Sequence, residues 1–119
     1  MAFIPHPVEA VMRVFVLVVR VLLTLLGVST GAVKLAHMPE EMAIFRQAGF
    51  PDAATVAFGV VQIAATLATL HPASRKPGAA VLALTFVVAT GVLFVNGMVP
   101  FGVFSLLFIA MAGLVYARG

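Results

Sequence analysis

The sequence predicts an all-α integral membrane protein, a four-helix bundle with a short surface helix between the first and second spans. Of the 119 residues, 63% are hydrophobic and only 9% are charged, whereas soluble domains carry roughly 25% charged residues. The charges are also unevenly placed, because residues 53–70 and 78–117 contain none, and ~20 apolar residues are enough to cross a bilayer as a helix. Short polar connections favour antiparallel neighbours within one domain, residues 1–119.

The first span is the end of a long apolar helical pattern that starts near residue 8. Arg13 and Arg20 interrupt its beginning, so residues 8–17 are expected near the headgroups, where long arginine side chains can reach water. Each later span is bounded by charged or helix-breaking residues. The four spans are expected at about residues 18–36, 52–70, 79–95 and 101–116.

A short surface helix is expected within residues 37–52, a charge-rich segment. Pro39 is followed by two glutamates, which is typical of a helix start. Gly49 and Pro51 are placed to end this helix. Asp52 is then predicted to be the N-cap of the second span.

The basic residues favour one orientation, with both termini in the cytoplasm and the chain in the cell membrane. Cytoplasmic loops carry an excess of Lys and Arg, and five basic residues lie at the end that holds the termini against two at the other end. The first group is Arg13, Arg20, Arg75, Lys76 and Arg118, and the second is Lys34 and Arg46.

Small and polar residues recur at helical spacing in every span. Such residues hold membrane helices together, so these stripes are expected to face the bundle interior. They either form a plain packing core, with threonines bonded to their own i−4 carbonyls, or line a pocket for a quinone or a lipid. The stripes are Arg20, Thr24, Gly27, Gly31 and Lys34; Thr55, Gly59, Gln62, Thr66 and Thr69; Thr85, Ala89 and Asn96; and Gly102, Ser105, Ala112 and Tyr116.

The candidate polar interior or ligand contacts come mainly from these stripes. Gln62 lies in the middle of an uncharged run and is expected to anchor two helices by a hydrogen bond, with a ligand contact as the alternative. A carboxamide cannot ionise, so an acid–base role is excluded. Lys34 is expected at the membrane surface in an exposed pair with Glu40 or Glu41, worth ~0–1 kcal/mol. The full set is Arg20, Lys34, His37, Gln62, Thr66 and Asn96.

Several classes of chemistry find no support in the sequence. The chain has no cysteine, which excludes thiol chemistry and Cys-ligated metals. His6, His37 and His71 fall in different parts of the predicted topology, so no metal site is expected. No nucleophile–base constellation is visible, and no intrinsic cofactor, catalytic residue or nucleic-acid partner is expected. The chain is therefore not expected to be catalytic on its own.

Four segments are similar to the DoxX-like family of small four-helix membrane proteins. They are "RVLLTLLGVSTGAVKL" (20–35), "FRQAGFP" (45–51), "GVVQI" (59–63) and "SRKPGAAVLAL" (74–84). The resemblance implies the four-helix membrane fold. It also implies a role near redox chemistry or assembly, since some members are linked to thiosulfate:quinone oxidoreductase or membrane redox complexes and distant relatives assist membrane-protein assembly. Where the family usually has a glutamate, this chain has Gln62.

Three functions are compatible with these observations to different degrees. The favoured one is an accessory or scaffold subunit of a membrane complex, in contact with lipids and other membrane-protein subunits or with copies of itself. The alternative is a quinone- or lipid-binding subunit of a membrane oxidoreductase. A small multidrug exporter is disfavoured, because proton-coupled export needs an intramembrane acid and residues 53–119 contain no Asp or Glu.

Overall fold

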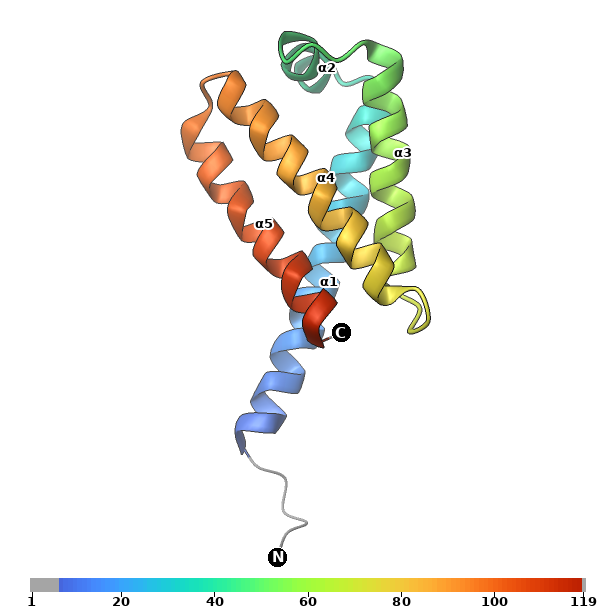
Figure 1. Ribbon diagram of the computed structural model, residues 1–119, viewed down its shortest axis with the longest axis vertical. Coiled ribbons are helices and arrows are strands. Elements are labelled where there is room, and N and C mark those ends of the chain that lie inside the picture. Colours follow the sequence, from blue (N-terminus) through green and yellow to red (C-terminus); the bar gives the residue numbers. More distant parts are fainter. Residues whose placement is uncertain (1–6, 119) are drawn as a thin grey trace, which may run out of the picture.

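The computed structural model describes residues 7–118, which form five α-helices and no strand. The predicted all-α class is therefore confirmed (Figure 1). In chain order the helices are α1 (Pro7–Leu35), α2 (Pro39–Gln47), α3 (Asp52–Ala68), α4 (Arg75–Val95) and α5 (Val99–Arg118).

The four longer helices pack in a ring, and α2 lies across one end of it. α1 contacts α3 and α5, and α4 contacts the same two helices. The molecule is elongated, with extents of 60 × 29 × 18 Å. α2 contacts α1, α3 and α4 at the end away from both described termini, while the first turns of α1 project beyond the other helices (Figure 1).

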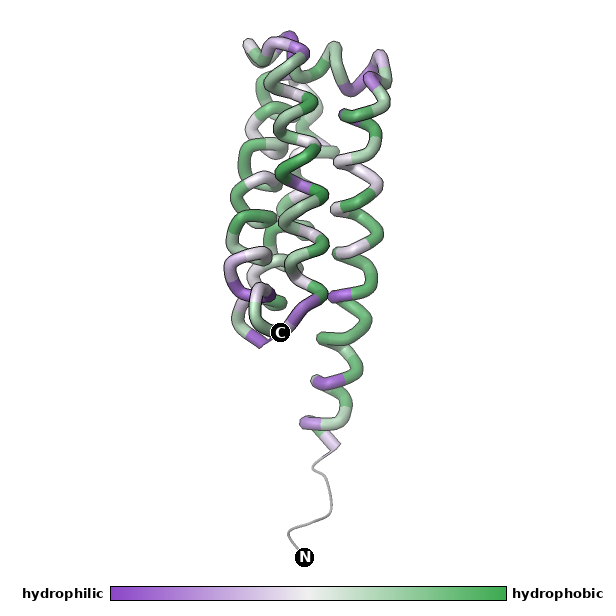
Figure 2. The backbone as a smooth tube through the Cα atoms, turned by 90° about the vertical axis from the view of Figure 1, so that its right-hand side faces the viewer, coloured by the Kyte–Doolittle hydropathy of each residue, from purple (hydrophilic) through white to green (hydrophobic). Residues whose placement is uncertain are grey.

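Three helices are long and apolar enough to cross a membrane, namely α1, α4 and α5. α3 has 17 residues and qualifies only together with α2, from which it is bent by 110°. The chain thus has three candidate spans, or up to four if this bent pair is one span. Figure 2 shows the hydrophobic middle of the molecule and its more hydrophilic ends, as expected for a membrane protein.

Two predicted turns are shorter than expected, because prolines lie inside first helical turns. α4 begins at Arg75, so Pro77 is its third residue, and α5 begins at Val99, directly before Pro100. The first N–H groups of a helix have no intrahelical partner, so a proline there costs no hydrogen bond.

Asp52 does not cap α3, contrary to the prediction. The N-cap is Pro51, and Asp52 is already helical. Its carboxylate instead binds Arg46 of α2 in a bidentate pair, with Nε–Oδ1 at 2.7 Å and Nη2–Oδ2 at 2.6 Å. The hydrogen bonds to Asp52 raise the pKa of Arg46 above its ordinary value, and the negative charge of Asp52 is the second, smaller cause. The pair is largely exposed and links the two helices across their sharp bend.

Three helices end in the same left-handed cap. His37, Gly49 and Gly97 follow α1, α2 and α4 with φ angles of 54°, 96° and 72°. After α2, the N–H of Gly49 binds the carbonyl of Arg46 and the N–H of Phe50 binds that of Phe45, which is the Schellman pattern. The predicted stop at Gly49 is confirmed.

Most of the predicted small and polar stripes face inward. All five residues of the stripe from Thr55 to Thr69 are buried, as are the glycines and Lys34 of α1. Tyr116 is the exception, because 47% of it is exposed. The threonine hydroxyls bind carbonyls of their own helices, as for Thr66 and the carbonyl of Gln62 at 2.6 Å. The apolar core beside these stripes comprises Val19, Leu23, Ala65, Ala79, Leu82, Phe86, Ala112 and Val115.

Glycines allow α1 and α3 to approach closely. A Cβ added to Gly59 would lie 2.8 Å from the Cβ of Lys34 and 2.9 Å from the carbonyl oxygen of Gly31. A Cβ added to Gly27 would lie within 2.9 Å of the Cγ2 of Thr66. Backbone and Cβ atoms cannot swing aside, so this crossing requires residues without side chains.

We expect Gly59→Ala to destabilise the fold by about 1–3 kcal/mol, the usual cost of overpacking. Gly113→Ala is the matched control, because an added Cβ there meets no atom within 4 Å. That change should be neutral or stabilise by up to ~1 kcal/mol through helix propensity. Unfolding in mild detergent, followed by circular dichroism, measures both. Equal stability of the two variants would contradict the close α1–α3 contact.

Candidate functional site: a cavity beneath α2

A cavity of about 150 Å³ lies beneath α2, and all five helices contribute to its wall. Its lining is mostly aromatic and aliphatic, with a few polar groups, which is the usual character of a small-molecule site. The apolar residues are Ile44, Phe45, Phe86, Ala89, Val92, Leu93 and Phe108, and the polar ones are Thr30, Lys34, Glu41, Gln62 and Ser105.

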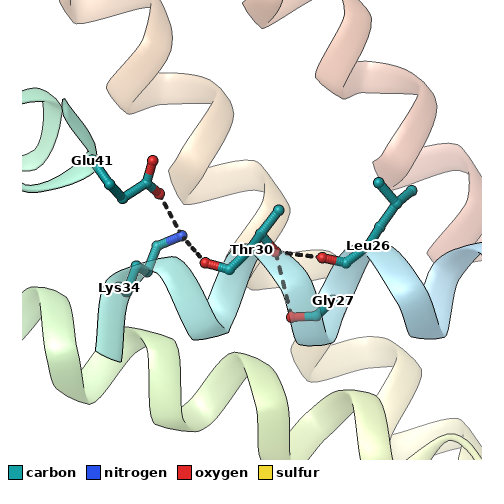
Figure 3. Close-up of polar contacts among 5 residues, drawn as sticks. All are labelled: Leu26, Gly27, Thr30, Lys34 and Glu41. Atoms are coloured by element: carbon teal, nitrogen blue, oxygen red, sulfur yellow. Dashed lines mark hydrogen bonds and ion pairs between the residues drawn. The ribbon is translucent and has the colours of Figure 1, made fainter. Parts of the chain in front are cut away.

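Lys34 is buried, although the sequence predicted an exposed position. Only 2% of the residue is accessible. Its Nζ lies 2.7 Å from Oε1 of Glu41 and donates to the carbonyl of Thr30 at 3.0 Å, as Figure 3 shows. The same Nζ lies 5.1 Å and 5.6 Å from the ring centroids of Phe45 and Phe58, within the range of cation–π attraction.

The partner of Lys34 is Glu41, and Glu40 is exposed on another face of α2. The expected exposed pair is therefore a largely buried one, since only 24% of the Glu41 side chain is accessible. In such a pair the desolvation of both ions offsets much of their attraction. Loss of one partner is still expensive, because it leaves the other charge buried without compensation.

Within residues 7–118, Gln62 does not form the interhelical hydrogen bond that the sequence predicted. Only 1% of the residue is accessible, and its Oε1 accepts no hydrogen bond from any residue in the described range 7–118. A buried acceptor without a donor costs ~1–3 kcal/mol. A side-chain hydrogen bond does join α4 to α5, where the hydroxyls of Thr90 and Ser105 lie 2.6 Å apart.

The remaining predicted candidates lie outside the cavity. Thr66 is buried against α1. Asn96 joins two helices, because its Nδ2 donates to the carbonyls of Ile44 and Val92 at 2.9 Å and 2.8 Å. His37 is exposed in the cap after α1, and Arg20 is half-buried toward the opposite end.

The cavity therefore brings together two of the six predicted candidates, Lys34 and Gln62. The sequence predicts Glu41 only as a member of an exposed ion pair and does not single out Thr30. The spacing held a signal for both. Glu41 lies four residues before the buried Phe45, so they share one face of α2, and Thr30 lies one turn before Lys34.

Residues 7–118 contain no group of three or more His, Asp or Glu side chains arranged to hold a metal ion. His37 and His71 are both exposed, the first directly after α1 and the second in the turn between α3 and α4. His6, the third histidine, lies outside the described residues.

We expect Lys34→Met to destabilise the fold by about 3–5 kcal/mol, because Glu41 would be left as an uncompensated buried charge. The double variant Lys34→Met/Glu41→Leu should recover most of this loss, since it removes both charges. Glu40→Gln is the control and should be neutral. Denaturation in detergent measures the free energy of unfolding of the three variants relative to wild type. A double variant that is no more stable than Lys34→Met would show that the uncompensated charge of Glu41 is not the cause of the loss.

A family model described as the DoxX-like family matches residues 18–115. No curated protein and no solved structure matches the chain. The matched segment contains every residue that lines the cavity. It also contains the close crossing of α1 and α3 and most of the described helices. The chain belongs to the DoxX-like family.

Proposed function

We propose that this protein is a non-catalytic membrane subunit that holds the hydroxylated head of a small hydrophobic ligand, a quinol or a lipid, in the cavity beneath α2. The proposal is carried by the buried Oε1 of Gln62, which accepts no hydrogen bond from residues 7–118. A hydroxyl in the cavity would supply the donor that this oxygen lacks.

The other groups of the cavity suit the same ligand. Lys34 has three N–H donors, of which two go to Glu41 and Thr30, so one remains for a ligand oxygen. Three phenylalanine rings in the lining, Phe45, Phe86 and Phe108, favour an aromatic or aliphatic body. A volume of about 150 Å³ accommodates about one six-membered ring, since an engineered cavity of that size binds benzene.

A ligand-holding role agrees with an accessory role in a larger membrane complex. A subunit that keeps a quinol or a lipid in place for a partner needs shape and hydrogen bonds rather than a nucleophile. The redox link implied by the family resemblance would then belong to the ligand and the partner. The accessory role and the ligand therefore form one proposal with two separable parts.

The proposal includes a topology in which α1, α3, α4 and α5 all cross the membrane and α2 lies at one surface. α3 is 17 residues long, which is at the short end of the range that can span a bilayer as a helix. Five basic residues at the end with the termini, against two at the α2 end, support cytoplasmic termini in a cell membrane.

The variant Gln62→Leu separates a ligand contact from a structural glutamine. If Gln62 serves the ligand, the leucine variant should lose the co-purified quinol or lipid, measured by mass spectrometry of an organic extract. Its ligand-free form should be more stable by ~1–3 kcal/mol, because the unpaired acceptor is gone. Gln47→Leu, at an exposed glutamine of α2, is the matched control and should retain the ligand.

Other outcomes would overturn the ligand proposal. If the wild-type protein carries no quinol or lipid, and takes up neither when it is added, the cavity does not bind such a ligand. Retention of the ligand by Gln62→Leu would show that it binds elsewhere. If the protein migrates as a free monomer in mild detergent, only the proposed role as an accessory subunit is overturned.

The topology can be tested with single cysteines, because the chain has none of its own. A membrane-impermeant maleimide applied to intact cells should label Gln47→Cys in α2. It should label Ala73→Cys, in the turn between α3 and α4, only after permeabilisation. Both positions are exposed. The reverse pattern would invert the orientation, and labelling of both in intact cells would show that α3 does not cross.

A further inference from the structure

A second hollow, of about 620 Å³, lies at the end of the molecule that holds the described termini. Three arginines line it. Arg13 and Arg20 lie seven residues apart, and thus on the same face of α1, while Arg118 comes from the last turn of α5. This hollow shares no lining residue with the cavity beneath α2.

The charge of this hollow is not neutralised by the described part of the chain. Within residues 7–118 the ion pairs are those of Lys34 and Arg46, and none of the three guanidinium groups that line the hollow takes part in one. Among the described residues, Glu9 is the one acidic side chain of the lining, and it forms no ion pair with any of them. Three cations against one anion make the hollow electropositive.

The remaining lining is apolar and continues onto the exposed face of α1. Val14 and Leu17 are 61% and 52% exposed, and Val21, one turn further toward the middle of the molecule, is 53% exposed. An apolar face beside a cluster of guanidinium groups complements an amphiphile with an anionic head. The other lining residues are Met12 and Val16.

We propose that this hollow binds the headgroup phosphate of an anionic diacyl phospholipid, whose acyl chains lie along the exposed face of α1. The planar guanidinium fork matches phosphate oxygens in a bidentate manner. Basic pockets formed by membrane helices are suited to lipid headgroups. This site is independent of the ligand proposed for the cavity beneath α2.

Native mass spectrometry of delipidated protein, titrated with phosphatidylglycerol or phosphatidylcholine, tests the site. Phosphatidylglycerol should bind in preference, and Arg13→Gln and Arg20→Gln should each weaken it about fivefold, the usual contribution of one basic residue at an anionic headgroup. Lys76→Gln is the matched control. It removes one exposed charge in the first turn of α4, outside the hollow, and should change binding less than twofold.

Two further measurements keep the proposal falsifiable. Arg13→Lys retains the charge but not the planar guanidinium fork, so its affinity for phosphatidylglycerol should lie between those of wild type and Arg13→Gln. The circular dichroism spectra of all variants should be unchanged. Inorganic phosphate should not displace the lipid at equal concentration. Displacement would assign the hollow to free phosphate. Equal binding of phosphatidylcholine would show that the negative charge of the headgroup is not recognised, and an equal loss in Lys76→Gln would leave only diffuse attraction. Each of these results would overturn the proposal.

Discussion

The ion pair between Lys34 and Glu41 is the contact on which the cavity depends. α2 is nine residues long, too short to be a stable helix alone in water, so its position must come from tertiary contacts. The Nζ–Oε1 contact of 2.7 Å joins its first turn to the last turn of α1. The side-chain amide of Asn96 donates to the carbonyl of Ile44 and holds the second turn of α2 to the end of α4. Polar contacts in both of its turns thus fix α2, which covers the cavity.

The position of Lys34 in turn depends on backbone features of α1 and α3. Gly59 leaves room for the Lys34 stem, because any Cβ there would meet it at 2.8 Å. The left-handed residue His37 then ends α1 and turns the chain back. Few non-glycine residues adopt this conformation, and histidine is among those enriched in it. His37 therefore contributes through its backbone, although the sequence marked it as a candidate for its imidazole ring.

The sequence predicted the elements well, because helical period, helix breakers and small residues are local signals. The stripe from Thr55 to Thr69 and the stop at Gly49 were read from spacing alone. The site was harder to predict, because burial and pairing depend on where separate helices meet. Nothing local to Lys34 indicates that α2 covers it, and nothing near Gln62 indicates that no neighbour reaches its oxygen. Asp52 was misassigned for the same reason, since its partner Arg46 lies on the preceding helix.

The family resemblance predicted a glutamate where this chain has Gln62, yet the cavity does contain a carboxylate. Glu41 brings it from α2, and one of its oxygens is already bound to Lys34. A carboxylate engaged in this way holds α2 in place over the cavity. The neutral carboxamide of Gln62 provides a buried acceptor that no described residue uses. Glu41 on α2 thus has a structural role, and Gln62 on α3 provides the unused acceptor. That division agrees with the proposed ligand-holding role, because the carboxylate of Glu41 is engaged by Lys34 and the carboxamide of Gln62 cannot ionise.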